Sequence, residues 1–271
     1  MIFPPLAPTG GSRFGMKCRE KRREKSKIFP SVSCLTLKLA TPDFSPKASC
    51  RSSTATAHSP IQARKRANYL ATVCSYLDTP EACLIAFWGH ILEARGYDGA
   101  YSFIDKGSAA LEPGNPLTDL LISDTEIKLL YGNLDIGGYG KGWLIDKLAF
   151  ALADRFGVQQ FLINGGGDLY VTHQNNQPVE IYLENPMRPG TLVGSTKLMN
   201  RGFACSSPHK RSWTNTAGID QNHIVTNTTM RDATYVTAPT AVAADAFATT
   251  FLLTSRAETA RLVADHQLEI L

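Results

Sequence analysis

The chain has 271 residues, 43% of them apolar, which is enough for one large folded unit or two small ones. Its net charge of +4 is unevenly spread: residues 1–66 hold 14 Lys and Arg against three Asp and Glu, so residues 67–271 carry about −7. Basic and aromatic residues are not interleaved in this acidic part, which argues against a nucleic-acid-binding protein.

The cysteines and the apolar runs exclude further classes. The six cysteines form no C-x-x-C pair, so neither a zinc site nor a redox dithiol is indicated, and we expect reduced thiols. No apolar run reaches the roughly 18–20 residues of a membrane-spanning helix, so no transmembrane segment is predicted. The basic cluster is not followed by the apolar stretch of a signal peptide, which leaves the cytoplasm as the default location.

Residues 1–66 are expected to lie outside the folded unit. They are rich in Pro, Ser and Thr and contain the charge run KCREKRREKSK over residues 17–27. Such composition predicts a disordered basic tail. An organelle transit peptide and a wrongly assigned gene start are the alternatives. The folded domain is therefore predicted over residues 67–271.

Local patterns predict the first half of this domain. Two helical pieces are expected between residues 68 and 96, broken near Pro80, followed by a polar linker over 104–126 and a strand over 127–130. A helix is predicted over 143–156, because Leu144, Leu148 and Leu152 share one face and Gly157 supplies a stop. A buried strand over 158–163 should follow it.

The second half reads as strands followed by helices. Residues 169–172 and 179–183 alternate as a hairpin around 174–177, and further strands are predicted over 191–197, 223–226 and 234–238. Thr240 can cap the first of two final helices, over 241–253 and 257–266. The fold class is therefore α+β, with mixed, largely antiparallel sheets and packed helices.

A glycine-rich loop precedes the helix, with the sequence LDIGGYGKG over residues 134–142. Such a loop lets backbone N–H groups approach an anion at a helix N-terminus, although a plain turn has the same composition. Gly142 stands where a Walker A loop needs Ser or Thr, and the glycine interval does not fit a Rossmann fingerprint. Lys141 could neutralise a pyrophosphate or be solvated, and Asp135 could bind a ligand hydroxyl or brace the loop.

Two further groups of polar residues could carry chemistry. Asp245 and Thr249 are four residues apart, so on a helix both oxygens share a face and could hold Mg²⁺. Alternatively, Thr249 bonds its own helix. Asp168 ends the turn NGGGD, where a structural Asx turn and a ligand contact are both compatible with the sequence. Asp146 is interpreted as a favourable partner of the helix dipole.

The order of these segments resembles that of the FAD:protein FMN transferases, the ApbE-type flavin transferases. The likeness runs from about Gly96 to the C-terminus and rests on three motifs in sequence, DIGGYGKGxxxD, NGGGD and ADAFAT. Each motif is weak alone, and their common order is specific.

The resemblance implies a set of site residues. Asp245, Thr249 and the backbone carbonyl of Gly138 would be the Mg²⁺ ligands, and Lys141 and Asp135 would contact the flavin nucleotide. His223 would be the general base, and Val225 would line the same pocket. Ser206 and Arg211 match a serine and an arginine of the family.

The reaction implied is Mg²⁺-dependent transfer of FMN from FAD to a threonine hydroxyl of an acceptor flavoprotein or redox subunit, with release of AMP. The acceptor threonine of the family lies in a D-x-x-T-type sequence. Two departures stand out. Residues 1–90 contain no counterpart of the usual N-terminal part, and TNTTM over 226–230 replaces D-P-x-T-G. A catalytically inactive flavin- or nucleotide-binding remnant is therefore the alternative, and a generic nucleotide-binding module is a third possibility.

Overall fold

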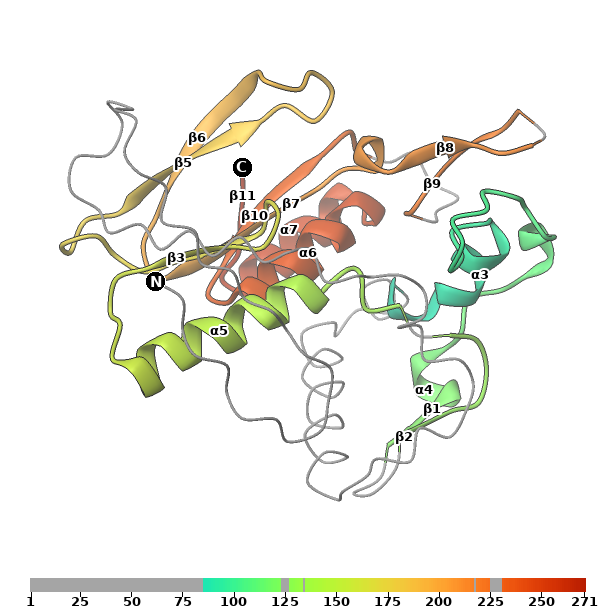
Figure 1. The fold of residues 1–271 in the computed structure, drawn as a ribbon, viewed down its shortest axis with the longest axis horizontal. Coiled ribbons are helices and arrows are strands. Elements are labelled where there is room, and N and C mark those ends of the chain that lie inside the picture. The colour runs from blue at the N-terminus through green and yellow to red at the C-terminus, as the bar shows by residue number, and fades with distance from the viewer. Residues whose placement is uncertain (1–84, 123–126, 134, 217, 225–230) are drawn as a thin grey trace.

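The computed structural model describes residues 85–122, 127–133, 135–216, 218–224 and 231–271 (Figure 1). The predicted tail over 1–66, the predicted break at Pro80 and the predicted pocket residue Val225 lie outside these residues.

An antiparallel five-stranded sheet forms the centre of the fold. Its spatial order is β11-β10-β7-β4-β3, and every neighbouring pair is antiparallel. The strands are β3 (Leu162–Asn164), β4 (Leu169–Val171), β7 (Arg201–Ser206), β10 (Thr234–Ala238) and β11 (Glu269–Ile270). Helices α5 (Gly140–Phe156) and α6 (Ala241–Leu253) pack against each other and against this sheet, and α7 (Arg256–Asp265) follows α6 (Figure 1).

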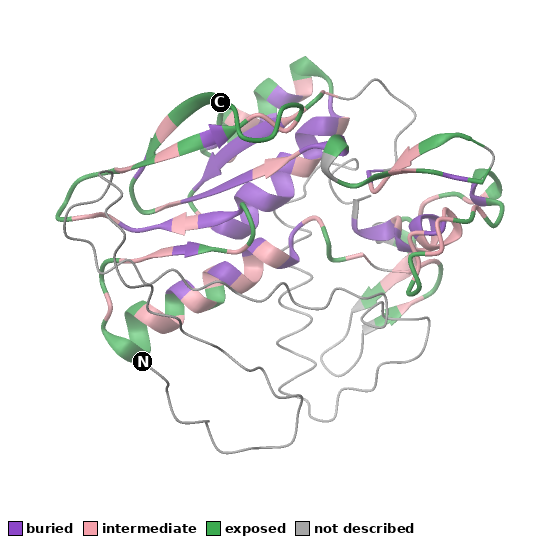
Figure 2. Cartoon of the chain, turned by 45° about the horizontal axis from the view of Figure 1, so that its top comes forward, coloured by how far each residue is buried: buried purple, intermediate pink, exposed green. Residues whose placement is uncertain are grey.

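Both faces of the sheet are covered, as the period-2 alternation of its strands requires. Ala204 and Val236 pack in one core cluster with α6, whereas their neighbours Phe203 and Tyr235 belong to a second cluster. That second cluster includes Leu183 and Leu198 of a separate hairpin, β5 (Val179–Glu184) with β6 (Leu192–Leu198). Figure 2 shows the resulting buried band through the sheet and α6.

Helix α6 is buried on almost every side because its sequence is apolar all round. Residues 241–248 are all buried, and only Thr249 and Leu253 of the helix are partly exposed. Its small residues allow a very close approach to β7: a Cβ on Gly202 would lie 2.5 Å from the backbone nitrogen of Ala241. Glycine at position 202 therefore lets the start of α6 rest directly on the sheet.

Shorter elements surround this body. Before the glycine loop lie η2 (Ile85–Phe87), α3 (Gly89–Ala94), η3 (Ser108–Ala110), α4 (Pro116–Asp119) and the hairpin β1 (Leu120–Ile122) with β2 (Ile127–Leu129). After β7 come η4 (Pro208–Lys210) and the hairpin β8 (Ser212–Thr214) with β9 (Asp220–Asn222).

The α+β class is confirmed, and so are the elements with a strong local pattern. The bounds predicted for β10 and α6 are those observed, and β2, β4, β5, β6 and α7 agree within two residues at each end. Helix α5 begins at Gly140, so it includes the end of the glycine loop. In the described parts of the chain, no helix is long and apolar enough to cross a membrane.

Four predictions of local structure were wrong. β4 does not pair with β5 but with β3 and β7, because the sheet and the hairpin are separate. β3 spans only 162–164. Residues 223–224 of the strand expected over 223–226 lie after β9 and are not in a strand, and residues 225–226 lie outside the described residues. The linker over 104–126 contains η3, α4 and β1. The pairing of strands is decided by tertiary contacts, which the local sequence pattern does not report.

Candidate active site

Three charged side chains from distant segments meet beside the start of α5, and we call them the carboxylate–lysine cluster: Lys141, Asp168 and Asp245. The Lys141 ammonium nitrogen lies 2.8 Å from Oδ1 of Asp245 and 3.0 Å from Oδ2 of Asp168. Both carboxylates are almost fully buried, and the lysine side chain is 26% exposed. The glycine loop, the NGGGD turn and the ADAFAT segment thus converge on one point, as the motif order predicts.

The backbone explains why these side chains meet. Lys141 lies in the first turn of α5, Asp168 immediately precedes β4, and Asp245 lies in the second turn of α6. Gly142 allows the two helices to touch, because a Cβ there would lie 2.3 Å from the carbonyl oxygen of Ala241. The Gly142 N–H also donates to Oδ2 of Asp245 at 2.9 Å. Asp245 is therefore held by α5 through both of its oxygens.

Electrostatics in the cluster are unbalanced, with two carboxylates facing one ammonium. Burial disfavours the charged ammonium, but the Asp245 and Asp168 carboxylates outweigh it and hold the pKa of Lys141 above its ordinary value. Burial, reinforced by the negative charge of Asp245, raises the pKa of Asp168 to about 6 in spite of Lys141. At neutral pH the cluster carries a net negative charge in a buried position, which favours an additional cation.

Thr249 lies one helical turn after Asp245. Its hydroxyl is 2.9 Å from the Ser206 hydroxyl, at the end of β7. The back-bond to the helix that the sequence allowed for Thr249 is made instead by Thr250, whose hydroxyl donates to the Ala246 carbonyl. Thr249 and Ser206 therefore form a pair of hydroxyls on the α6–β7 side of the cluster.

The two glycine segments use many of their own backbone donors. Oδ1 of Asp135 accepts the N–H of Gly137 at 2.7 Å, so Asp135 braces the loop, the structural role considered for it. Burial raises the pKa of this carboxyl, against the effect of that hydrogen bond. Oδ1 of Asn164 accepts the N–H groups of Gly166 and Gly167, both with positive φ, and so fixes the NGGGD turn.

The donor set suits Mg²⁺ in chemistry. Asp245, Thr249 and the carbonyl of Gly138 supply only oxygen atoms, and so does Asp168, whose buried Oδ2 accepts no well-aligned hydrogen bond from the described residues. The described residues contain no group of three or more His, Cys, Asp or Glu that could hold a metal. A metal here would therefore have few carboxylate ligands from the protein, as Mg²⁺ commonly does. The net charge of the carboxylate–lysine cluster and the oxygen donors around it therefore fit Mg²⁺.

His223 follows β9 and is held by Arg211. Its backbone N–H and its Nδ1 lie 3.2 Å and 3.3 Å from the Arg211 carbonyl oxygen. Burial lowers the pKa of His223 to about 4, and the positive charges of Arg211 and Lys141 act in the same direction. The imidazole is therefore neutral at pH 7. With Nδ1 donating to the carbonyl, Nε2 carries the lone pair that a general base needs.

Aromatic residues around Arg211, whose carbonyl holds His223, were not predicted as part of a site. Tyr97 stacks on Trp213 with ring centroids 5.5 Å apart, and the Tyr97 hydroxyl lies 3.4 Å from Nη1 of Arg211. Trp213 also lines an open pocket of about 490 Å³ between η4, β8 and β9. The sequence signal that could have found this group is the aromatic content of residues 97–103, but no motif marks these residues as part of a site.

The role assigned to Asp146 was wrong. Helix α5 begins at Gly140, so Asp146 lies beyond its first turn, and its carboxylate accepts the N–H groups of Ala241 and Val242 at the start of α6, at 2.8 Å and 2.9 Å. Asp146 is thus a cap for the neighbouring helix, a contact that spans 95 residues of sequence.

Comparisons with known proteins identify the fold and the family of the chain. Three solved structures share the fold: the ApbE protein of Thermotoga maritima (18% identity, TM-score 0.62, covering 76% of this chain and 72% of that one), the flavinyl transferase ApbE of Pseudomonas stutzeri (16%, 0.56, 77% and 68%) and the flavin transferase ApbE of Vibrio cholerae (14%, 0.52, 81% and 72%). The search of curated proteins gave no match. The ApbE family model matches residues 112–271, which is more than half of the chain and includes the whole carboxylate–lysine cluster. The chain belongs to the ApbE family.

Proposed function

We propose that this protein is a flavin transferase that moves FMN from FAD to a threonine hydroxyl of an acceptor flavoprotein and releases AMP. The observation that carries the proposal is the meeting of Lys141 and Asp245, from motifs 104 residues apart, inside the region matched by the ApbE family. Two of the structures that share the fold are named flavin transferases, which supports the same activity here.

Lys141 and the adjacent loop form the phosphate end of the proposed site. The ammonium is a point charge suited to a pyrophosphate, and its contact with Asp245 keeps it in place before substrate binds. Asp245, Thr249 and the Gly138 carbonyl would hold Mg²⁺, which supplies charge neutralisation for the pyrophosphate when bound. Asp168 adds the second negative charge that makes an extra cation favourable.

His223 is the proposed general base. Its neutral imidazole is oriented by the Arg211 carbonyl, which leaves Nε2 free to accept the proton of an incoming hydroxyl. Because its pKa is low, this base stays unprotonated across the physiological range, at the cost of some driving force for proton transfer. We place Asp135 and Val225 at the flavin nucleotide as well, Asp135 chiefly by shaping the loop.

The proposed step balances without an external reductant or oxidant. A bond forms between the threonine oxygen and the FMN-side phosphorus of FAD, and the bond from that phosphorus to the bridging oxygen of the pyrophosphate breaks. The hydroxyl proton passes to His223, and the bridging oxygen leaves with AMP. The product is FMN joined to the acceptor by a phosphoester bond.

The test is in-gel flavin fluorescence after the full chain is mixed with FAD, Mg²⁺ and an acceptor domain carrying a D-x-x-T sequence. We expect a fluorescent acceptor band that requires Mg²⁺ and disappears with Asp245→Ala. A sample with an established flavin transferase proves the acceptor competent. If that sample is labelled and this chain labels nothing, the transferase proposal fails. Retained FAD affinity in equilibrium dialysis would then favour the inactive flavin-binding alternative.

A further inference from the structure

Helices α5 and α6 cap each other. The N–H of Gly142, in the first turn of α5, donates to Asp245 on α6, while the N–H groups of Ala241 and Val242, in the first turn of α6, donate to Asp146 on α5. First-turn N–H groups have no partner within their own helix, and a carboxylate near them also interacts favourably with the helix dipole. Each helix therefore supplies the carboxylate that the other needs.

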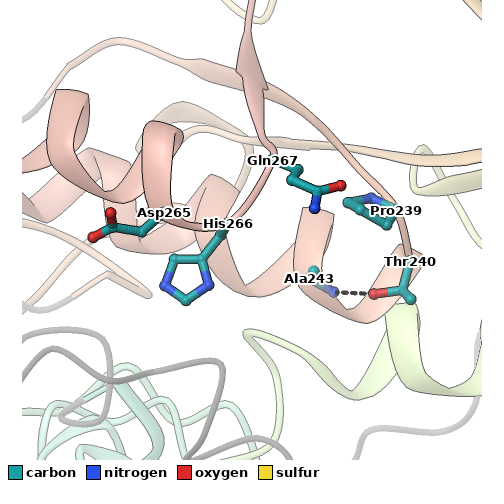
Figure 3. Close-up of a pocket in the computed structure, with 6 residues that line it drawn as sticks. All are labelled: Pro239, Thr240, Ala243, Asp265, His266 and Gln267. Atoms are coloured by element: carbon teal, nitrogen blue, oxygen red, sulfur yellow. Dashed lines mark hydrogen bonds between the residues drawn. The ribbon is translucent and has the colours of Figure 1, made fainter.

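The N-terminus of α6 has no further first-turn donor to offer a ligand. The third N–H, of Ala243, donates to the Thr240 hydroxyl at 3.2 Å. A pocket of about 270 Å³ lies beside this helix end, whose first-turn N–H groups already have acceptors (Figure 3). The contacts at this end therefore serve the packing of the two helices.

The packing leaves little freedom at the crossing. With a Cβ on Gly142 only 2.3 Å from the Ala241 carbonyl oxygen, the two backbones are in direct contact there. Asp146 lies one turn further along α5 than Gly142, and Asp245 lies one turn further along α6 than Ala241. Each carboxylate thus lies one helical turn from the contact, and a shift of one helix end changes both sets of hydrogen bonds.

We propose that Asp146 is a positioning residue of the active site. By holding Ala241 and Val242 against α5, it sets the place of Asp245 relative to Lys141 and Gly142. The effect of Asp146 on catalysis rests on the proposed function. Its effect on the geometry of the site does not, because that geometry is present without FAD or metal.

A matched control separates positioning from ordinary capping. Ser255 caps α7 by accepting the N–H of Glu258 at 3.2 Å, and α7 carries no residue of the site. Ser255→Ala therefore removes a helix cap from the same sheet-and-helix body without touching the α5–α6 crossing.

The test is amide hydrogen exchange in the full chain without FAD or metal, comparing Asp146→Ala and Ser255→Ala with the wild type. The reporter is the Gly142 amide, because its acceptor is Asp245, and the Val236 amide in the sheet reports global opening. We expect Asp146→Ala to speed Gly142 exchange by roughly tenfold or more, the local effect of losing a cap, with Val236 much less affected. Ser255→Ala should leave Gly142 unchanged.

Two results would overturn the proposal. In the first, Asp146→Ala speeds exchange at Ala241 and Val242 but not at Gly142. In the second, Gly142 and Val236 speed up equally, which would mean a global loss of stability. If Asp146→Ala does not fold, Asp146→Asn takes its place, since it keeps the shape and one acceptor oxygen, and a smaller rise at Gly142 is expected.

The same variants in the transfer assay give the catalytic consequence. We expect kcat to fall with Asp146→Ala and not with Ser255→Ala, while KM for FAD changes less than kcat. If the wild type transfers no flavin but the exchange result holds, the proposed function fails and the positioning role stands. If the wild type is active and Gly142 exchange is unaffected by Asp146→Ala, the positioning role fails alone.

Discussion

The two ends of the candidate active site are built in different ways. The carboxylate–lysine cluster is buried between two helices and a sheet, and its contacts of 2.8–3.0 Å join three segments of the chain. The end with His223 lies on a short hairpin, is partly exposed and is held by contacts of 3.2–3.4 Å.

The difference suggests a division of labour. A rigid, charged cluster suits the part of a substrate that is the same in every reaction, here the pyrophosphate. A looser segment suits the part that must admit a protein acceptor, because loops adapt more easily than packed helices. We therefore expect substitutions in the cluster to affect chemistry and folding together, and substitutions at His223 to affect chemistry alone at neutral pH.

The largest effect is expected from Asp245→Asn. It removes the charge that Lys141 and the proposed Mg²⁺ share, so transfer should fall by about 10³-fold, or about 4 kcal/mol in transition-state stabilisation. Thermal unfolding should also shift downward, because Lys141 loses a buried partner. The control is Asp265→Asn, an exposed carboxylate paired with Arg261, which should change neither quantity measurably.

His223→Gln should come next, with a loss of about 10²-fold in kcat, the usual contribution of a general base. The fold should be unaffected, since glutamine can keep a hydrogen bond to the Arg211 carbonyl. Flavin transfer and far-UV circular dichroism on the same sample measure the two parts. A variant that loses activity only through unfolding would break the contrast between the two ends.

Gly142→Ala tests the helix crossing. The added Cβ would meet the Ala241 carbonyl oxygen, a backbone atom that cannot move independently, so we expect destabilisation of about 2 kcal/mol. Gly194→Ala in the β5–β6 hairpin is the matched control, because its Cβ would meet only a Leu183 side-chain atom at 3.7 Å. Urea denaturation of both variants measures the difference, and equal midpoints would show that the crossing is loose.

The smallest effect concerns pH and His223. Its folded pKa of about 4 lies below the ordinary value of 6.5, so between these values the unfolded chain binds more protons than the folded one. The free energy of unfolding contributed by this group is therefore present above pH 6.5 and is lost as the pH falls towards 4. His223→Gln should lose less stability than the wild type over that window. Denaturation midpoints at pH 7 and pH 5 check this, and parallel losses would contradict it.

The local sequence pattern predicted the bounds of the most buried strand and helix, but it did not predict how the strands pair. Residues 234–238 and 241–253 were predicted with their observed bounds, because a buried strand and an apolar capped helix have strong local signatures. The pairing of β4 with β7, and not with β5, depends on contacts between distant strands that no periodicity reveals.

The same limit applies to the site. The family resemblance implied that Lys141 and Asp245 belong to one site, and in the structure their side chains lie 2.8 Å apart. Asp146 could not be assigned from its own surroundings, since its hydrogen-bond partners lie in another helix. Tyr97 and Trp213, 116 residues apart, meet by ring stacking that neither local sequence predicts.

The most direct test of the central claim measures the amounts of the two products, AMP and the modified acceptor. The full chain is incubated with FAD, Mg²⁺ and a competent acceptor, and AMP release is measured beside mass spectrometry of the acceptor. We predict one AMP for each FMN attached to a threonine, with both products lost in Asp245→Asn. AMP release without acceptor modification, or neither product from the wild type while an established transferase yields both, would contradict the account.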